Sequence, residues 1–267
     1  MSRIREAFAM AQETDRAAFI AYVTAGDPSP GRTPEVVDGL LDAGIDILEL
    51  GVPFSDPIAD GPTNQLAAER ALAAGTTLET VLEIATDIRS RSQVPIVLFT
   101  YANPVVRMGI DRFAGRARQA GVDGVLFTDV PLEEYDRFSP ALRSAQLDPV
   151  MLVTPTSDRA RIKAGARASG GFLYLVSRTG VTGARRSLDR GLADLVKTVR
   201  KAARLPVAVG FGISTPDQVA EVASLADGVV VGSAIVNQVA AHGDADGLGA
   251  AVQTFTRPLV EATRRDS

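Results

Sequence analysis

The sequence contains no cysteine and only one histidine, and both facts narrow the chemistry available to it. The lack of cysteine excludes a disulfide framework and a thiolate metal site. His242 sits in the polar segment "AAHGDADG", where we interpret it as a solvated loop residue. One imidazole cannot build a histidine-rich metal site, so we expect no metal in this chain.

Charge and hydropathy exclude two further classes of protein. The formal net charge is −4, which gives no basic footprint for nucleic acid. No apolar run approaches the roughly 20 residues of a membrane span. The N-terminal "MSRIREAFAM" is too short and too charged for a secretory signal, so we expect a soluble, cytoplasmic protein.

Eight short apolar runs alternate with helical patterns along the 267 residues. The runs are "FIAYVT", "DILELGV", "PIVLFTY", "GVLFTDV", "DPVMLVT", "FLYLVS", "PVAVGFG" and "GVVVGSA". Continuous apolar runs suit strands that are buried on both faces of a parallel sheet. This number and spacing predict a (β/α)8 TIM barrel that forms a single domain over residues 1–267. A doubly wound sheet is the alternative, but it normally has fewer strands.

The second and third runs stand further apart than the others. The segment between them, "PTNQLAAERALAAG", has room to form an additional helix after the second strand. Polar and turn-forming residues follow each run, as in "ELGVPFSDPIADGP", "TYANP" and "SRTGVTG". Active sites of such barrels lie at these C-terminal strand ends, whereas the Gly-Asp connections "AGID", "AGVDG" and "LADG" read as structural.

The last two strand ends carry a pattern that favours an anion site. "VGFGIST" and "VVGSAIV" supply Gly210, Gly212 and Gly232, and Ser233 opens a short apolar helix. Unshielded backbone N–H groups and a helix N-terminus bind phosphate without a lysine. The alternative is that these glycines only permit tight turns. A dinucleotide fingerprint is rejected, because its third glycine and ribose-binding acid are missing.

Carboxylates and hydroxyls remain as the candidates for catalysis. The three lysines (Lys163, Lys197 and Lys201) fall in helical patterns and not at strand ends, which disfavours Schiff-base chemistry. Glu49 alternates with apolar neighbours and is expected to point into the barrel mouth, where burial would raise its pKa. Asp60 lies in the following loop, where its residue type and position support a role in the turn and a role in catalysis almost equally.

The stretch "LELGVPFSDPIADGPTNQ" resembles the signature of the tryptophan synthase alpha subunit family, and similarity extends over about residues 3–262. "AYVTAGDP", "TYANP", "GVLFTDVP", "YLVSRTGVTG", "VGFGIS" and "GSAIV" match in order and spacing. The resemblance implies a (β/α)8 fold and retro-aldol cleavage of indole-3-glycerol phosphate to indole and glyceraldehyde 3-phosphate. It also implies an αββα complex with a beta subunit that carries pyridoxal phosphate, and no cofactor in this chain.

The resemblance assigns roles to individual residues. Glu49 takes the place of the acid–base glutamate and Asp60 that of the aspartate that contacts indole. The remaining substrate-binding assignments are Tyr22, Phe99, Tyr101, Thr128, Tyr174, Thr182, Gly183, Gly210, Phe211, Gly212, Gly232 and Ser233. Family members often have Phe, Leu and Ala at positions 22, 99 and 128. The sequence therefore does not determine how the indole ring packs against Tyr22, Phe99 and Thr128. The segment "SRTGVTGARRS" is expected to act as a lid, in which Thr182 contacts Asp60.

Three other functions share parts of this pattern. A freestanding indole-glycerol-phosphate lyase would act without a beta subunit. A different phosphosugar barrel enzyme would keep the glycine sites and reject indole substrates. A non-catalytic activator of a beta subunit would bind the ligand only, which the intact Glu49 and Asp60 disfavour.

Overall fold

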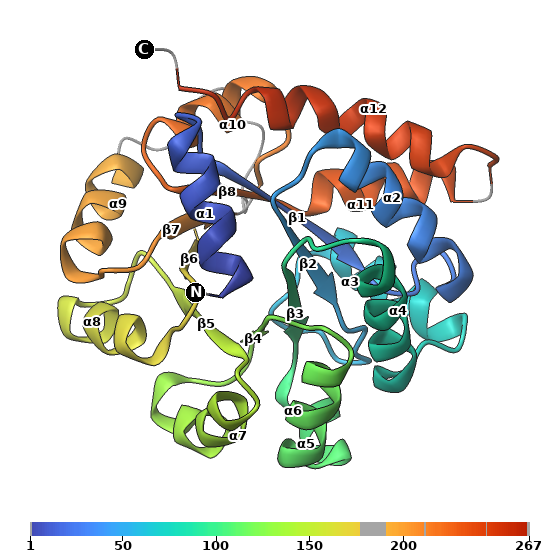
Figure 1. Ribbon diagram of the computed structural model, residues 1–267, viewed down its shortest axis with the longest axis horizontal. Coiled ribbons are helices and arrows are strands. Elements are labelled where there is room, and N and C mark those ends of the chain that lie inside the picture. The colour runs from blue at the N-terminus through green and yellow to red at the C-terminus, as the bar shows by residue number, and fades with distance from the viewer. Residues whose placement is uncertain (1, 177–190, 211, 244, 266–267) are drawn as a thin grey trace.

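A computed structural model describes residues 2–176, 191–210, 212–243 and 245–265 of the chain. Its centre is a closed barrel of eight parallel strands in sequence order, surrounded by helices (Figure 1). The strands are β1 (Ala18–Thr24), β2 (Ile47–Gly51), β3 (Ile96–Thr100), β4 (Gly124–Phe127), β5 (Asp148–Val153), β6 (Leu173–Val176), β7 (Val207–Gly210) and β8 (Gly228–Val231). The predicted TIM barrel is confirmed.

Helices follow the strands around the outside of the barrel. They are α2 (Thr33–Ala43), α3 (Pro62–Ala73), α4 (Leu78–Arg91), α5 (Ala102–Met108), α6 (Ile110–Gln119), α7 (Ser139–Ser144), α8 (Arg159–Ala168), α9 (Gly191–Ala202), α10 (Pro216–Ala223), α11 (Ser233–His242) and α12 (Leu248–Glu261). Two short 3-10 helices, η1 (Pro30–Arg32) and η2 (Leu132–Arg137), lie in connections. The additional helix predicted after the second strand is α3.

Helix α1 (Arg3–Glu13) lies across the N-terminal end of the barrel (Figure 1). Its buried residues Ile4 and Phe8 pack against the inward side chains of the strands, and the ring of Phe8 contacts that of Phe172 in a tilted arrangement at 5.5 Å between centroids. The helix therefore closes this end of the barrel and leaves the C-terminal strand ends as the open end.

The alternation along β2 places Glu49 inside the barrel. Ile47 packs in the inner cluster with α1, whereas Leu48 and Leu50 pack in the outer cluster beneath the helices. Because side chains alternate along a strand, Glu49 shares the inward face with Ile47. The inward orientation expected from the sequence is confirmed.

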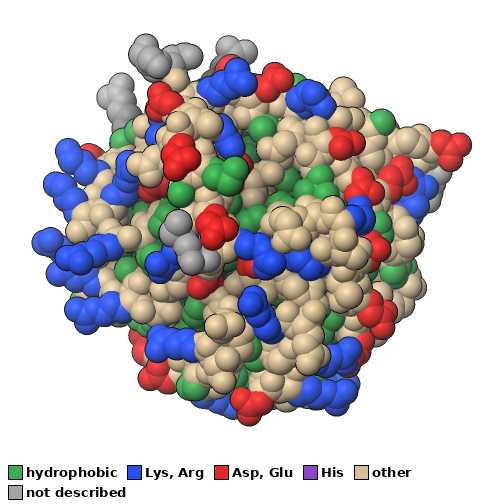
Figure 2. All heavy atoms as spheres, in the orientation of Figure 1, with side chains coloured by type: hydrophobic (Ala, Val, Ile, Leu, Met, Phe, Trp, Pro, Cys, Tyr) green, Lys and Arg blue, Asp and Glu red, His purple; other side chains and the backbone are tan. Residues whose placement is uncertain are grey.

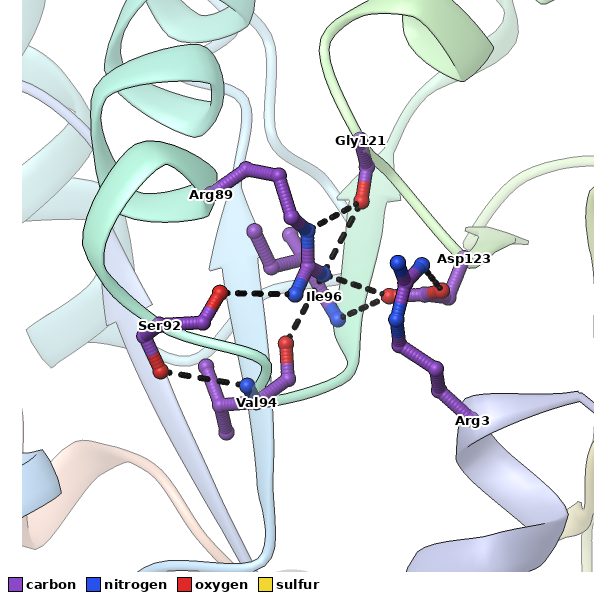
Figure 3. A network of polar contacts seen from close by, with 7 residues as sticks. All are labelled: Arg3, Arg89, Ser92, Val94, Ile96, Gly121 and Asp123. Atoms are coloured by element: carbon purple, nitrogen blue, oxygen red, sulfur yellow. Dashed lines mark hydrogen bonds and ion pairs between the residues drawn. The ribbon is translucent and has the colours of Figure 1, made fainter.

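The Gly-Asp connections fix the N-terminal ends of the strands. Three aspartates in these connections each accept a hydrogen bond from a backbone N–H of the preceding strand. Asp46 accepts from Phe19 in β1 at 2.7 Å, Asp123 from Ile96 at the start of β3 at 2.9 Å, and Asp227 from Val207 at the start of β7 at 2.9 Å. Asp123 also pairs with Arg3 of α1 and Arg89 of α4 (Figure 3). The three carboxylates thus fix strands at the end opposite the open mouth, and Asp123 also ties them to two helices, which is the structural role that the sequence predicted.

The structure corrects the prediction for His242 and agrees with the sequence on membrane-spanning helices. His242 is the last residue of α11, not a loop residue, and its Nδ1 lies 3.0 Å from the carbonyl oxygen of Gln238. The prediction of a loop was wrong because the apolar run "AIVNQVAA" extends the helix through His242. In the described ranges, no helix has the length and apolar character needed to cross a bilayer.

Candidate active site

A cavity of about 420 Å³ opens at the C-terminal ends of the strands. Its lining comes from β1, β2, β3, β5, β6 and β8 and from the segments that follow β2, β4, β7 and β8. The lining residues are Tyr22, Glu49, Ala59, Asp60, Gly61, Pro62, Thr63, Asn64, Phe99, Thr128, Leu152, Tyr174, Val176, Gly212, Val230, Gly232 and Ser233. The structure therefore brings the two predicted acids and most of the predicted binding residues to one space.

Glu49 has a fully buried side chain, and neither of its carboxyl oxygens has a hydrogen-bond partner in the described part of the chain. Burial disfavours the charged carboxylate and raises the pKa of Glu49 to about 8. The group therefore holds a proton near neutral pH. A carboxyl group that faces a cavity, uncompensated by any described cation, is suited to donating that proton to a ligand and taking one back.

Asp60 is held in place by side chains from two directions. The Tyr101 hydroxyl donates to Asp60 Oδ2 at 2.8 Å and accepts from the Ala59 N–H at 3.1 Å. Burial raises the Asp60 pKa, and hydrogen bonds from Tyr101 and Asn64 act in the opposite direction. Asp60 is thus a positioned acceptor at the cavity wall, beyond what a simple turn residue requires.

Tyr22 and Tyr174 present two further hydroxyl groups to the cavity. Both side chains are buried, and burial together with the nearby Glu49 and Asp60 raises the pKa of each tyrosine well above its usual value. Both therefore remain protonated and can donate hydrogen bonds at any physiological pH. The Tyr22 hydroxyl also lies 3.2 Å from the Thr24 hydroxyl.

Glycines make room for these two tyrosines. A side chain at Gly51 would overlap the Tyr22 hydroxyl, and one at Gly210 would overlap the Tyr174 hydroxyl. Gly210 is not among the residues that line the cavity. Its contact with Tyr174 gives it a steric role beneath the site, apart from the phosphate contact predicted for it.

Gly212, Gly232 and Ser233 lie together on the β7–β8 side of the cavity. Gly212 has a φ of 73°, a left-handed conformation that favours glycine. Ser233 begins α11, and Gly232 precedes it as the N-cap. A helix N-terminus carries N–H groups without intrahelical partners and positive dipole charge, as an anion site requires, and the N-terminal residue of this helix lines the cavity.

Tyr22 connects the two ends of the cavity. Its ring meets Phe99 edge-on at 5.1 Å between centroids, on the side of β3. Its Cβ and ring also border the position that a Gly232 side chain would occupy, on the side of β8. The cavity therefore runs from an aromatic end, near Phe99 and Asp60, to a glycine-rich end near Ser233.

Not every residue that the sequence singled out lines the cavity. Thr182, Gly183 and Phe211 lie outside the described residues, as does the whole of the expected lid, residues 177–187. Asp56, which lies between Glu49 and Asp60 in the sequence, is exposed and accepts a hydrogen bond from its neighbour Ser55 at 2.6 Å.

The sequence interpretation missed several lining residues. Asn64, which forms a hydrogen bond with Asp60, belongs to the stretch "DGPTNQ" at the start of α3. Its position in the cavity follows only from the placement of α3 beside the loop. Leu152, Val176 and Val230 supply apolar wall from strands whose inward positions the alternation could have identified. In the described ranges, no three His, Asp or Glu side chains are grouped so as to hold a metal ion.

Comparisons with known proteins agree in the family that they indicate. A family model described as "Tryptophan synthase alpha chain" matches residues 8–263. The tryptophan synthase alpha chain of Solibacter usitatus is 52% identical over 259 residues, which cover 97% of each chain. That of Geobacter sulfurreducens is 52% identical over 98% of this chain and 99% of its own. A structure of Mycobacterium tuberculosis tryptophan synthase superposes with a TM-score of 0.90 at 36% identity, covering 99% of both chains.

Proposed function

The chain belongs to the tryptophan synthase alpha chain family, and from this premise we propose that its cavity cleaves indole-3-glycerol phosphate to indole and D-glyceraldehyde 3-phosphate. The observation that carries the proposal is Glu49, a buried carboxyl group with no described partner, which lines a cavity with one aromatic and one glycine-rich end. This arrangement suits a substrate with a flat ring at one end and a phosphate at the other.

The substrate orientation follows from the two ends of the cavity. The indole ring lies against Phe99 and Thr128, with its N–H toward Asp60. The phosphate accepts hydrogen bonds from the N-terminus of α11 at Gly232 and Ser233, and from the Gly212 segment. The glycerol carbons then lie between them, within the space bordered by Glu49, Tyr22 and Tyr174.

Glu49 begins the reaction in its protonated form. It donates its proton to indole C3, which creates an indoleninium whose C=N⁺ can accept the electrons of the breaking carbon–carbon bond. The Glu49 carboxylate that remains takes the proton of the adjacent glycerol hydroxyl as that bond breaks. A pKa near 8 lets one carboxyl group carry out both steps at neutral pH.

Asp60 stabilises the charge that develops on the ring. Its carboxylate accepts the indole N–H, and Tyr101 and Asn64 fix it in position before the charge appears. Preorganised acceptors of this kind need no rearrangement during the reaction. Because the substrate itself provides the electron sink, the reaction requires no lysine Schiff base.

Chains of this family carry no cofactor of their own, and pyridoxal phosphate is bound by the beta subunit that forms tryptophan synthase with them. We propose that the two chains form an αββα heterotetramer and that the reaction takes place in the cytoplasm, with residues 1–267 acting as one domain. The exposed apolar side chains of Ile58, Leu66 and Val106 stand near the open end of the barrel and suit a partner surface.

The experiment that tests the function is an assay of indole release from indole-3-glycerol phosphate, with and without a beta subunit. The chain has no tryptophan, so indole fluorescence has little protein background. Indole release that a beta subunit increases supports the proposal. Release that a beta subunit leaves unchanged would indicate a freestanding lyase, and absence of release in both conditions would contradict the assigned reaction.

A further inference from the structure

A second cavity, of about 1080 Å³, lies at the opposite end of the barrel from the candidate active site. Its walls come from α1, α8, the C-terminal part of α9 and the segment that leads into β7, and Arg265 borders it near the C-terminus. Figure 2 shows Lys and Arg side chains gathered along the side of this face that α8 and α9 occupy in Figure 1. We call this cavity the basal groove.

The basal groove is lined by seven cationic side chains and one anionic side chain, Asp227. The chain as a whole has more acids than bases, 32 against 28, so this composition is a local feature. Asp227 is already engaged, since Arg200 donates to its Oδ1 at 2.6 Å. Arg16 is also engaged, since its Nη2 donates to Asp46 Oδ1 at 2.7 Å. Five of the seven positive charges of the groove therefore have no counterion among the described residues.

Three of the cations are free to meet a ligand. Lys163 and Arg167 on α8 and Arg204 after α9 are exposed, and none makes a hydrogen bond or ion pair with another described residue. Because α8 and α9 pack against each other, these side chains project from neighbouring walls of one groove.

Two further cations support the walls. Arg5 donates to the carbonyl oxygen of Gly170, and Arg265 donates to the carbonyl oxygens of Ala223 and Ala226. Since carbonyl oxygens are neutral, these hydrogen bonds position the two guanidinium groups without cancelling their charge. The groove thus combines fixed and adjustable cations.

This arrangement costs stability in the free protein. Lys163 and Arg167 are four residues apart on one helix, a spacing at which like charges repel. Helix α8, "RARIKAGARA", contains no acid that could compensate them. A bound anion would remove the repulsion, so the groove is expected to be more stable with a ligand than without one.

We propose that the basal groove binds a small polyanion of the polyphosphate class. A single phosphate would engage only part of a groove of this size, whereas a chain of phosphates can reach cations on both α8 and the α9–β7 segment. Guanidinium groups match phosphate oxygens in geometry, and four of the five fixed or free cations are arginines, next to a single lysine.

The test uses the full chain with inorganic triphosphate as the probe, in the presence of saturating glycerol 3-phosphate to occupy the candidate active site. Calorimetry should show saturable binding of one triphosphate per chain. The Lys163→Gln/Arg167→Gln double variant should weaken that binding at least about tenfold, because two charges adjacent to the anion are removed. The same variant should melt at a higher temperature than the parent chain without ligand and should lose the stabilisation that triphosphate gives the parent.

Lys197→Gln/Lys201→Gln is the matched control. It removes two charges at the same four-residue spacing from α9, and neither lysine lines the basal groove. Equal weakening by both double variants would mean diffuse attraction and would overturn the proposal, as would an absence of saturable binding. Citrate binding as tight as that of triphosphate would overturn the assignment to polyphosphates.

Discussion

The Tyr101 hydroxyl donates a hydrogen bond to Asp60 Oδ2 at 2.8 Å, and Phe54 packs on the Tyr101 ring at 5.0 Å between centroids. Asp60 is therefore connected, through one tyrosine, to the outer part of the loop that follows β2. The proposed acceptor of the indole N–H and the exposed Ile58, which suits a partner surface, belong to the same loop.

Tyr101→Phe should lower kcat/KM for indole formation by about tenfold or more, because a hydrogen bond to a charged group typically contributes about 1.5–3 kcal/mol. Tyr101 lowers the Asp60 pKa, so the acidic limb of the pH–rate profile should also move to higher pH. Tyr135→Phe is the matched control, since the buried Tyr135 hydroxyl has no hydrogen-bond partner among the described residues. Equal effects of the two variants would mean that Tyr101 acts through packing alone.

Asp60→Asn keeps hydrogen-bonding capacity at position 60 and removes its negative charge. If Asp60 stabilises the developing positive charge on the ring, turnover should fall by a factor that corresponds to about 3 kcal/mol. The melting temperature should change little, because relief of a partly buried charge offsets the altered hydrogen bonds. A variant that loses stability and keeps its turnover would return Asp60 to the role of a turn residue.

Ile58→Asp tests the proposed surface for the beta subunit. Ile58 is 86% exposed, so a charge there does not disturb the core, but it would be buried unpaired in an apolar interface. Titration of the beta subunit should show weaker association and less stimulation. Met10→Asp, a comparable change at a 63% exposed residue of α1, should leave association unchanged. Similar effects of both variants would place the interface elsewhere.

Ser233→Asp places a negative charge at the N-terminus of α11, where the substrate phosphate is proposed to bind. The apparent KM should rise strongly and the affinity for glycerol 3-phosphate should fall, because the two negative charges repel at short range. Unchanged affinity, measured by calorimetry, would show that the phosphate binds at another place in the cavity.

Local patterns were sufficient to predict the barrel, because each strand is an apolar run and each strand end is marked by turn residues. They also placed Glu49 correctly, since its orientation follows from alternation along a single strand. The contacts of Asp60 could not be derived in this way. Its partners Tyr101 and Asn64 come from another strand end and from α3, and only the closed barrel sets the distances between them.

Helix α1 illustrates a second limit of local patterns. The spacing of Ile4, Phe8 and Ala11 gives an amphipathic helix, but nothing in that spacing says that its apolar face closes the end of the barrel. The same applies to the basal groove. Lys163 looks like a solvated helix residue until α1, α8 and α9 are assembled around one space.

Glu49→Gln separates the chemistry of this residue from its effect on stability. The variant keeps the shape of the side chain and removes its titration, so indole formation should fall at least about 100-fold. Burial raises the folded-state pKa of Glu49 from 4.5 to about 8. Between these two values the folded protein binds more protons at this site than the unfolded chain does, so stability falls as the pH rises from 4.5 and levels off above 8.

Glu49→Gln should therefore differ little from the parent chain at pH 4.5 and be more stable by a few kcal/mol at pH 8.5, where the buried carboxylate of the parent is charged. Urea unfolding at several pH values measures this difference. Glu83→Gln, at an exposed position of α4, should show no such pH-dependent gain. If Glu49→Gln is inactive and its stability relative to the parent does not change with pH, the carboxyl group is not desolvated in solution, and its double role as acid and base loses its physical basis.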